Sequence, residues 1–334
     1  MGIATDVGVR EPGAVDGGVR RRRGGPGAWF AGLLLLGVSV VVGCRIADTD
    51  ALTPVPQLLA FLPWLLAPTA LALLLALLTR WRTGLVWGVA ALAAVAWFME
   101  PYGKTSDPSG PPLADLRVLT ANVLLGQASD ALVTAVRRER PDLVFVPECE
   151  QRCTEALKVL ADDYPYRSAV EKYGSEGSVI LGRTPFTATG GIPGTLGMPG
   201  AVAEVKGQKI RLQLAHPMPP LPDTVGVWRR ELGALRDFAA AEPDIPTIIA
   251  GDFNATQDHA AFRRILDTGL RDSSRLAGEA RTPTWPSRSA RVIGAQIDHV
   301  LVSEDFTAHT ARFLDLPDTD HRAVLTDLTL HRPR

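Results

Sequence analysis

One stretch of the chain ends an apolar run with two polar side chains that could do chemistry together. Thr247–Ala250 is apolar, β-prone and bounded by Pro and Gly, which predicts a buried strand. Residues two apart on an extended backbone point the same way, so Asp252 and Asn254 should project together while Phe253 turns into the core. A carboxylate beside an amide at a sheet rim could bind a ligand, although the same residues in a turn could merely cap backbone groups.

Four further segments place polar groups at the ends of predicted strands. They are Asn122 closing Leu116–Asn122, Glu148 closing Leu143–Glu148, Asp298 opening Ile297–Ser303, and Asp320 with His321 before a final strand. His216 follows a predicted strand at Ile210–Leu214. Hydrolysis of a phosphate ester or anhydride needs neutralised phosphoryl oxygens, an in-line water and help for the leaving oxygen. Hard oxygen ligands without a Cys/His cluster favour Mg²⁺ or Mn²⁺ for that chemistry.

The order of these motifs (Asn, Glu, Gly-Asp-x-Asn, Ile-Asp, Asp-His) resembles the endonuclease/exonuclease/phosphatase superfamily, which has the DNase I-like fold. The resemblance covers about residues 115 to 330. It implies an α/β fold built as a four-layer α-β-β-α sandwich, with two mixed sheets face to face and the strand-end residues gathered at one rim.

The same resemblance implies where a metal ion and the attacked phosphate would lie. It places Mg²⁺ (or Mn²⁺) on Glu148, with Asn122 and Asp320 close to the ion. Asp252 and Asn254 would orient or deprotonate the water and hold the phosphoryl group. Glu148 could instead only cap the helix after its strand, but its position behind four apolar residues favours the metal site.

Two histidines complete the implied catalytic set. His321 would contact the phosphate or pass a proton, with Asp298 fixing its tautomer, and His216 would stabilise the transition state or protonate the leaving group. The family leaves the identity of the general base open. His299 should face the opposite side of the strand from Asp298. The remaining histidines, His259, His309 and His331, are expected in loops or at surface ends.

The first hundred residues have a different character, because they hold five of the seven Trp and most of the long aliphatic runs. Residues 1–27 are rich in Gly and Arg, which predicts a disordered cytoplasmic tail. Three uncharged apolar spans follow and predict three transmembrane helices within residues 28–99. These spans are Ala28–Cys44, Pro56–Thr79 and Gly84–Met99.

Arginine placement predicts the orientation of these spans. Arg20–Arg23 precede the first span, and Arg80 and Arg82 separate the second from the third. The positive-inside rule then puts everything after residue 99 outside the cytoplasm. Residues 100–114 have the composition of a linker, and 115–334 form the predicted catalytic domain. Val41–Cys44 is similar to a bacterial lipobox, and lipidation at Cys44 would leave the catalytic domain outside as well.

Cys149 and Cys153 are spaced one helical turn apart, which allows a disulfide or two buried free thiols.

The net charge of the predicted catalytic domain argues against a surface that binds duplex nucleic acid. Eight of the 35 Lys and Arg and six of the 36 Asp and Glu precede residue 101, so the rest of the chain has a net charge of −3. The predicted catalytic domain therefore lacks the net basic charge that duplex binding usually shows, although Arg263 with Arg264 and the stretch Arg281–Arg291 could make local contacts.

The three predicted spans, the external catalytic domain and the set of motifs together also resemble the VanJ-type membrane proteins of actinomycetes associated with teicoplanin resistance. That narrower resemblance implies a cell-membrane phosphatase acting on a lipid pyrophosphate of the undecaprenyl type or another envelope phosphate. The alternatives are an extracytoplasmic nuclease or phosphodiesterase, and an inactive envelope protein that binds a phosphorylated ligand. An inactive relative would be expected to lose at least one site residue, and none is missing.

Overall fold

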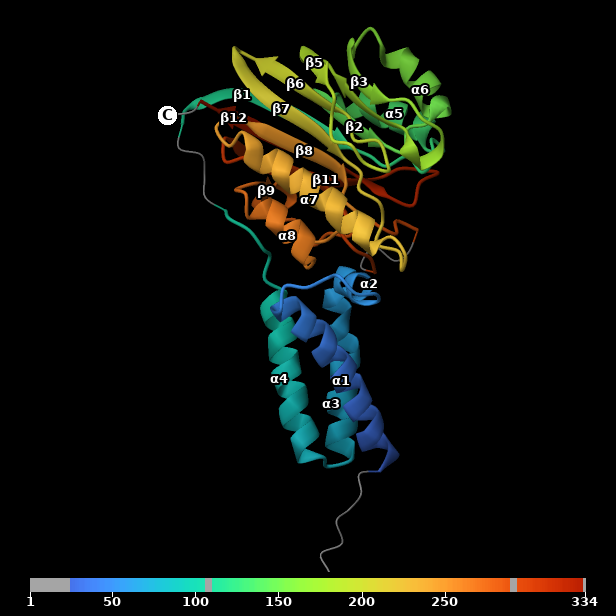
Figure 1. The fold of residues 1–334 in the computed structure, drawn as a ribbon, viewed down its shortest axis with the longest axis vertical. Helices are drawn as coiled ribbons and strands as arrows, with labels where there is room; N and C mark the ends of the chain where they lie inside the picture. Colours follow the sequence, from blue (N-terminus) through green and yellow to red (C-terminus); the bar gives the residue numbers. More distant parts are fainter. Residues whose placement is uncertain (1–24, 106–109, 289–292, 333–334) are drawn as a thin grey trace, which may run out of the picture.

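The computed structural model describes residues 25–105, 110–288 and 293–332, and shows a narrow helical bundle with a larger α/β domain seated on one end (Figure 1). The bundle contains α1 (Pro26–Ile46), α2 (Val55–Ala60), the 3₁₀ helix η1 (Leu62–Leu65), α3 (Leu66–Leu78) and α4 (Arg82–Phe98). Helix α1 begins inside the segment predicted as a tail. Residues 1–24 of that segment, including Arg20–Arg23, lie outside the described part of the chain.

Among the described residues, α1 is the one helix whose length and apolar composition suffice for crossing a membrane. The prediction of three membrane-spanning helices is therefore supported for α1 alone. Pro63 explains why the second predicted span is not one continuous helix, because proline lacks a backbone N–H and its ring clashes with the preceding turn. The helix breaks at Phe61, and the uninterrupted α3 has 13 residues, or about 20 Å. Helix α4 has 17 residues, which is also short of the usual span.

Apolar side chains point both into and out of this bundle. Leu35, Leu59 and Leu62 are fully buried between the helices, whereas Val86 and Trp97 are 73% and 78% exposed. The outward-facing residues lie on all three long helices and include Trp29, Leu33, Leu36, Leu74, Leu77, Leu78 and Val89. A helix that is apolar all round is normally surrounded by protein or by lipid.

The α/β domain contains two six-stranded sheets. The first has the order β11 (Phe306–Asp315), β12 (Arg322–His331), β1 (Pro112–Thr120), β2 (Leu143–Pro147), β4 (Ser178–Gly182), β3 (Tyr166–Val170). The second has the order β5 (Phe186–Thr189), β6 (Gly200–Val205), β7 (Gln208–Ala215), β8 (Thr247–Asp252), β10 (Asp298–Val302), β9 (Arg271–Asp272). Most neighbours are antiparallel, but β1–β2 and β7–β8 are parallel, so both sheets are mixed.

The two sheets pack face to face, and helices cover their outer faces. Val118, Phe145, Leu212, Ile248 and Val324 form part of the buried layer between the sheets. Helices α5 (Ser129–Glu139) and α6 (Gln151–Leu157), with η2 (Lys158–Leu160), pack on the first sheet, and α7 (Val225–Ala241) and α8 (Ala260–Leu266) pack on the second. Two short turns, η3 (Gly174–Glu176) and α9 (Ser273–Leu276), complete the domain. The predicted four-layer α-β-β-α sandwich is confirmed.

The structure differs from the sequence expectation mainly at sheet edges. Strand β1 already begins at Pro112, inside the segment expected to be a linker, because Pro112 pairs with His331 of β12. Strands β3, β5, β9 and β11 were not predicted. The first three are only two to five residues long, and β11 is an edge strand in which apolar and polar residues do not alternate regularly. Strands of this kind carry little periodic apolar signal.

The domain is docked on the bundle through buried polar contacts. Asp50 is fully buried and accepts a hydrogen bond from the backbone N–H of Ala261 at the start of α8 (2.7 Å). His259 was expected in a loop or at a surface end, but it is 1% exposed and its Nε2 lies 2.8 Å from the carbonyl oxygen of Pro56. A partner 203 residues away in the sequence keeps this histidine inside the interface.

Candidate active site

Sheet topology brings the predicted site residues to one rim. The carboxyl ends of the parallel pairs β1–β2 and β7–β8 carry Asn122, Glu148, His216 and Asp252. Strand β10 runs antiparallel to β8, and its first residue, Asp298, pairs directly with Asp252. Face-to-face packing of the sheets then places these groups together.

Gly251 makes the close approach of β7 and β8 possible. Its φ is 151°, and a Cβ built on it would lie 2.0 Å from the carbonyl oxygen of Ala215 on β7. Any side chain at this position would therefore push the two strands apart just before Asp252 and His216. The glycine sets the spacing on which the site depends.

Asn122 joins two carboxylates. Its Nδ2 donates to Glu148 Oε1 (3.2 Å) and to Asp252 Oδ2 (3.1 Å), while its Oδ1 accepts from the backbone N–H of Leu124 (3.0 Å). Glu148 also accepts from the N–H of Leu125 (2.9 Å). Glu148 has a φ of 58°, a conformation that non-glycine residues adopt rarely and mostly at functional sites. Its carboxylate is thus held in a defined orientation with 15% of the side chain exposed.

His321 is fixed by two aspartates. Its Nδ1 lies 2.9 Å from Asp298 Oδ2, and its Nε2 lies 3.8 Å from Asp252 Oδ2. Burial opposes a charge on this imidazole, but the neighbouring Asp298 and Asp252 carboxylates outweigh it and raise the pKa of His321 to about 10. A protonated His321 can donate from Nε2 to a phosphoryl oxygen at neutral pH.

The pKa values of Asp252 and His216 at the same rim are shifted in opposite directions. Burial and the nearby Asp298 raise the pKa of Asp252 to about 7, so this carboxylate is close to the range expected of a general base. Burial, with a smaller effect of the His321 charge, lowers the pKa of His216 to about 3. His216 is thus neutral, with Nε2 3.9 Å from Glu148 Oε1.

Asn254 lies at the same rim and connects it to the loop after β7. Its backbone N–H donates to Asp252 Oδ1 (2.8 Å), and its side-chain Nδ2 donates to the carbonyl oxygen of Pro217 (3.1 Å). The residue has a φ of 48°, a region that asparagine tolerates better than most residues. Phe253 between them is fully buried against Phe262 and His299, as the alternation of the strand predicted.

Asp320 stands at the edge of the rim and is held by a residue that the sequence did not single out. Trp285 Nε1 donates to Asp320 Oδ2 (3.0 Å), and Asp320 Oδ1 lies 3.9 Å from His321 Nε2. A tryptophan flanked by Thr284 and Pro286 gives no signal of its own, and only its place in the fold reveals this role.

The residues fit a hard divalent cation. Three buried atoms in the described site have no hydrogen-bond partner and are available to a ligand: Asp298 Oδ1, Asp320 Oδ1 and His216 Nδ1. Ligand atoms of Asp252, Asp298 and His321 also lie within 4.8 Å of one another. His321 Nδ1 is already bonded to Asp298, however, so this trio is better described as a hydrogen-bonded Asp–His pair beside a second carboxylate. The oxygen donors as a whole suit Mg²⁺ or Mn²⁺.

Cys149 follows Glu148 directly and forms a disulfide with Cys153, with a Cα–Cα distance of 5.0 Å. The bond joins the turn after β2 to helix α6 and settles the choice that the sequence left open between a disulfide and two free thiols. Both cysteines are buried against the first sheet.

Comparison with known proteins places this arrangement in a family. The model of the Endonuclease/Exonuclease/phosphatase family matches residues 119–321, which is more than half of the chain. The chain belongs to this family. A search of curated proteins found no match. The matched range contains every strand-end residue described above, from Asn122 to His321.

Solved structures share the fold at low sequence identity. A humanised zebrafish TDP2 with 14 mutations has 19% identity and a TM-score of 0.54, covering 64% of this chain and 98% of its own. Zebrafish TDP2 complexed with single-strand DNA product has 18% identity and a TM-score of 0.53 (64% and 99%). A Beutenbergia cavernae endonuclease/exonuclease/phosphatase has 19% identity and a TM-score of 0.51 (65% and 72%). At these identities the likeness establishes the DNase I-like fold.

Proposed function

We propose that this protein is a membrane-anchored, extracytoplasmic, metal-dependent phosphohydrolase that removes phosphate from a lipid pyrophosphate. Family membership supports phosphate-ester or anhydride hydrolysis, and the outward-facing apolar side chains of α1, α3 and α4 favour a bundle embedded as three spans. The Cys149–Cys153 disulfide favours an oxidising compartment for the catalytic domain. A link to teicoplanin resistance belongs to the same proposal, because such a lipid carries cell-wall precursors.

One observation carries the lipid substrate: the rim of the candidate active site lies against the connection between the apolar helices. Gln57 of α2 donates to the carbonyl oxygen of Pro220, in the loop that follows His216. The ring of Phe61 lies 6.4 Å from that of Trp285, whose indole N–H holds Asp320. A phosphate at the bilayer surface would therefore meet the site without leaving the membrane region.

The site residues have defined tasks in this reaction. Glu148 would hold the metal, with Asp320 beside it and Asn122 as the hydrogen-bond donor that orients Glu148. The bound ion would neutralise phosphoryl oxygens. Asp252, held by Asn122 and the Asn254 N–H, is placed to orient or deprotonate water. His321, oriented by Asp298, would donate to the phosphate, and neutral His216 would stabilise the transition state as a hydrogen-bond donor.

The proposal is tested with the full-length protein in liposomes containing undecaprenyl pyrophosphate and Mg²⁺ or Mn²⁺. Wild type should release inorganic phosphate, and His321→Ala should lower the rate at least a hundredfold, since it removes a charged donor from the phosphate. His309→Ala is the matched control, because His309 is exposed on β11 and bonds only to Thr329 among the described residues. In cells, wild type should also raise tolerance to teicoplanin relative to His321→Ala.

The nuclease or phosphodiesterase alternative has one specific observation in its favour. Solved relatives include the zebrafish TDP2 complex whose name records a single-strand DNA product. Efficient DNA cleavage by the purified protein, with the lipid left intact, would establish this alternative and overturn the lipid phosphatase. Binding of the lipid without turnover of any substrate would instead support a phosphate-binding envelope protein.

A further inference from the structure

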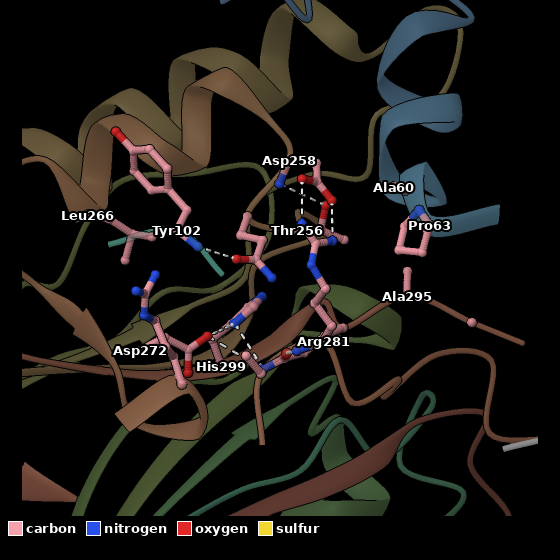
Figure 2. Close-up of a pocket in the computed structure, with 15 residues that line it drawn as sticks. Ala60, Pro63, Tyr102, Thr256, Asp258, Leu266, Asp272, Arg281, Ala295 and His299 are labelled. Atoms are coloured by element: carbon pink, nitrogen blue, oxygen red, sulfur yellow. Dashed lines mark hydrogen bonds and ion pairs between the residues drawn. The ribbon is translucent and has the colours of Figure 1, made fainter. Parts of the chain in front are cut away.

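Residues 281–285 connect the helical bundle with the candidate active site. Figure 2 shows the Arg281 side chain extending toward Asp258, with Ala295 and the bundle residues Ala60 and Pro63 to the right of this pair. These residues line a cavity of about 30 Å³, which is enough for about one water molecule and too small for a substrate. The region is therefore a packed interface between the bundle and the catalytic domain, and it positions residues 281–285.

Arg281, the first residue of this segment, forms hydrogen bonds with the helical bundle. Its Nη2 donates to the carbonyl oxygen of Phe98 (2.6 Å) and its Nε to that of Met99 (3.1 Å), at the C-terminus of α4. Carbonyl groups at a helix C-terminus lack intrahelical partners and attract a cation. The same guanidinium binds both carboxylate oxygens of Asp258, at 2.6 and 3.0 Å. Arg45 of α1 also approaches Asp258, at 3.8 Å.

Thr284 and Trp285 hold the active-site strands at the other end. The Thr284 hydroxyl accepts from the backbone N–H groups of Ile297 (3.0 Å) and Asp298 (3.1 Å). The Thr284 carbonyl oxygen accepts from the N–H of Arg322 (2.8 Å), the residue after His321. Trp285 completes the set through its bond to Asp320. The segment thus contacts the chain on either side of the catalytic Asp–His pair.

The backbone at Arg281 depends on these contacts. Its φ is 64°, a left-handed conformation that costs a non-glycine residue about 1 kcal/mol or more and persists only where the surroundings enforce it. Besides the side-chain bonds, its N–H donates to Gln296 Oε1 (2.8 Å), two residues before Asp298. Loss of the guanidinium contacts should let this turn relax.

We propose that Arg281 is a positioning residue for the hydrolytic reaction. Its bonds to the end of α4 and to Asp258 fix the segment 281–285, and the segment in turn fixes Asp298 and Asp320. The helical bundle then acts as part of the active-site scaffold in addition to anchoring the domain. This inference rests on the proposed hydrolysis for its kinetic test, whereas the metal-binding test below does not.

The experiment compares Arg281→Met and Arg281→Lys in the full-length protein in detergent. Methionine keeps the length of the side chain without the fork of donors, and lysine retains the charge but not the bidentate geometry. The matched control is Arg264→Met, since Arg264 also crosses to the bundle, bonding Asp48 at 3.3 Å, but belongs to α8 and not to the segment. Two measurements are made: the kinetics (kcat and KM) of phosphate release from undecaprenyl pyrophosphate with Mg²⁺, and the binding of Mn²⁺ (Kd) by electron paramagnetic resonance.

We expect Arg281→Met to lower kcat about 10- to 100-fold with KM within about twofold, and to weaken Mn²⁺ binding about tenfold, as residues that orient ligating groups do. Arg281→Lys should lie between this variant and wild type, and Arg264→Met should stay within twofold. If Arg281→Met unfolds, as seen in its circular dichroism, the lysine variant decides. The proposal is overturned if the folded Arg281 variants match wild type in kcat and in Mn²⁺ affinity. It is also overturned if Arg264→Met loses as much kcat and Mn²⁺ affinity as Arg281→Met. Absence of turnover in wild type would count against the proposed function, and the Mn²⁺ measurement would still decide the role of Arg281.

Discussion

At the scale of single residues, Glu148 is the group whose charge the proposed chemistry needs most. Its carboxylate accepts from Asn122 and Leu125 and is held by a left-handed backbone. Glu148→Gln keeps the size and one acceptor oxygen but removes the charge that would hold a divalent cation. We expect phosphate release to fall more than tenfold, a loss of at least about 1.4 kcal/mol of transition-state stabilisation, with little change in thermal unfolding.

Glu150→Gln serves as the control, because among the described residues the Glu150 side chain accepts a hydrogen bond only from the N–H of Gly174 (3.2 Å) and from no residue of the site. Steady-state phosphate release from the two variants gives the comparison. Retention of more than about a tenth of wild-type activity in Glu148→Gln would mean that another residue is the principal metal ligand.

At the scale of elements, the contact between β7 and β8 should be unusually sensitive to a methyl group. Gly251→Ala would place its Cβ 2.0 Å from the carbonyl oxygen of Ala215, so the parallel pair must separate. We expect a loss of more than about 2 kcal/mol in unfolding free energy, together with reduced activity. Gly233→Ala in α7 is the control, since nothing lies within 4 Å of its added Cβ and alanine favours a helix by up to about 1 kcal/mol. Equal midpoints in thermal unfolding of the two variants would refute the packing argument.

Element by element, the sequence predicts what is local and misses what depends on distant partners. Asp252 and Asn254 could be placed at a strand end because apolar periodicity and a following glycine are local signals. The burial of His259 could not, because its partner is the carbonyl oxygen of Pro56. Trp285 and Arg281 were missed for the same reason: each owes its role to a contact with Asp320 or α4 that only the folded chain creates.

At the scale of the whole molecule, the two ends of the bundle differ in charge. Arg80 and Arg82 are exposed at the end away from the catalytic domain, where α3 turns into α4 (Figure 1). At the catalytic end, Arg45 lies beside Asp258 and is 11% exposed, so it is partly neutralised. For the proposed three-span bundle, the positive-inside rule predicts that the Arg80 end lies in the cytoplasm.

Reporter fusions at the two ends test this orientation. Alkaline phosphatase, which needs an oxidising compartment to form its disulfides, should be active when fused after Arg334 and inactive when fused after Arg80 of a truncated chain. Green fluorescent protein should give the opposite pattern. Replacing Arg80 and Arg82 with Glu should reduce the difference between the two fusion sites for both reporters. The turn between α3 and α4 would then lack the positive charge that favours the cytoplasmic side. Fluorescence from the Arg334 fusion with inactive alkaline phosphatase would place the catalytic domain in the cytoplasm. A lipid pyrophosphate presented at the outer face would then be out of its reach.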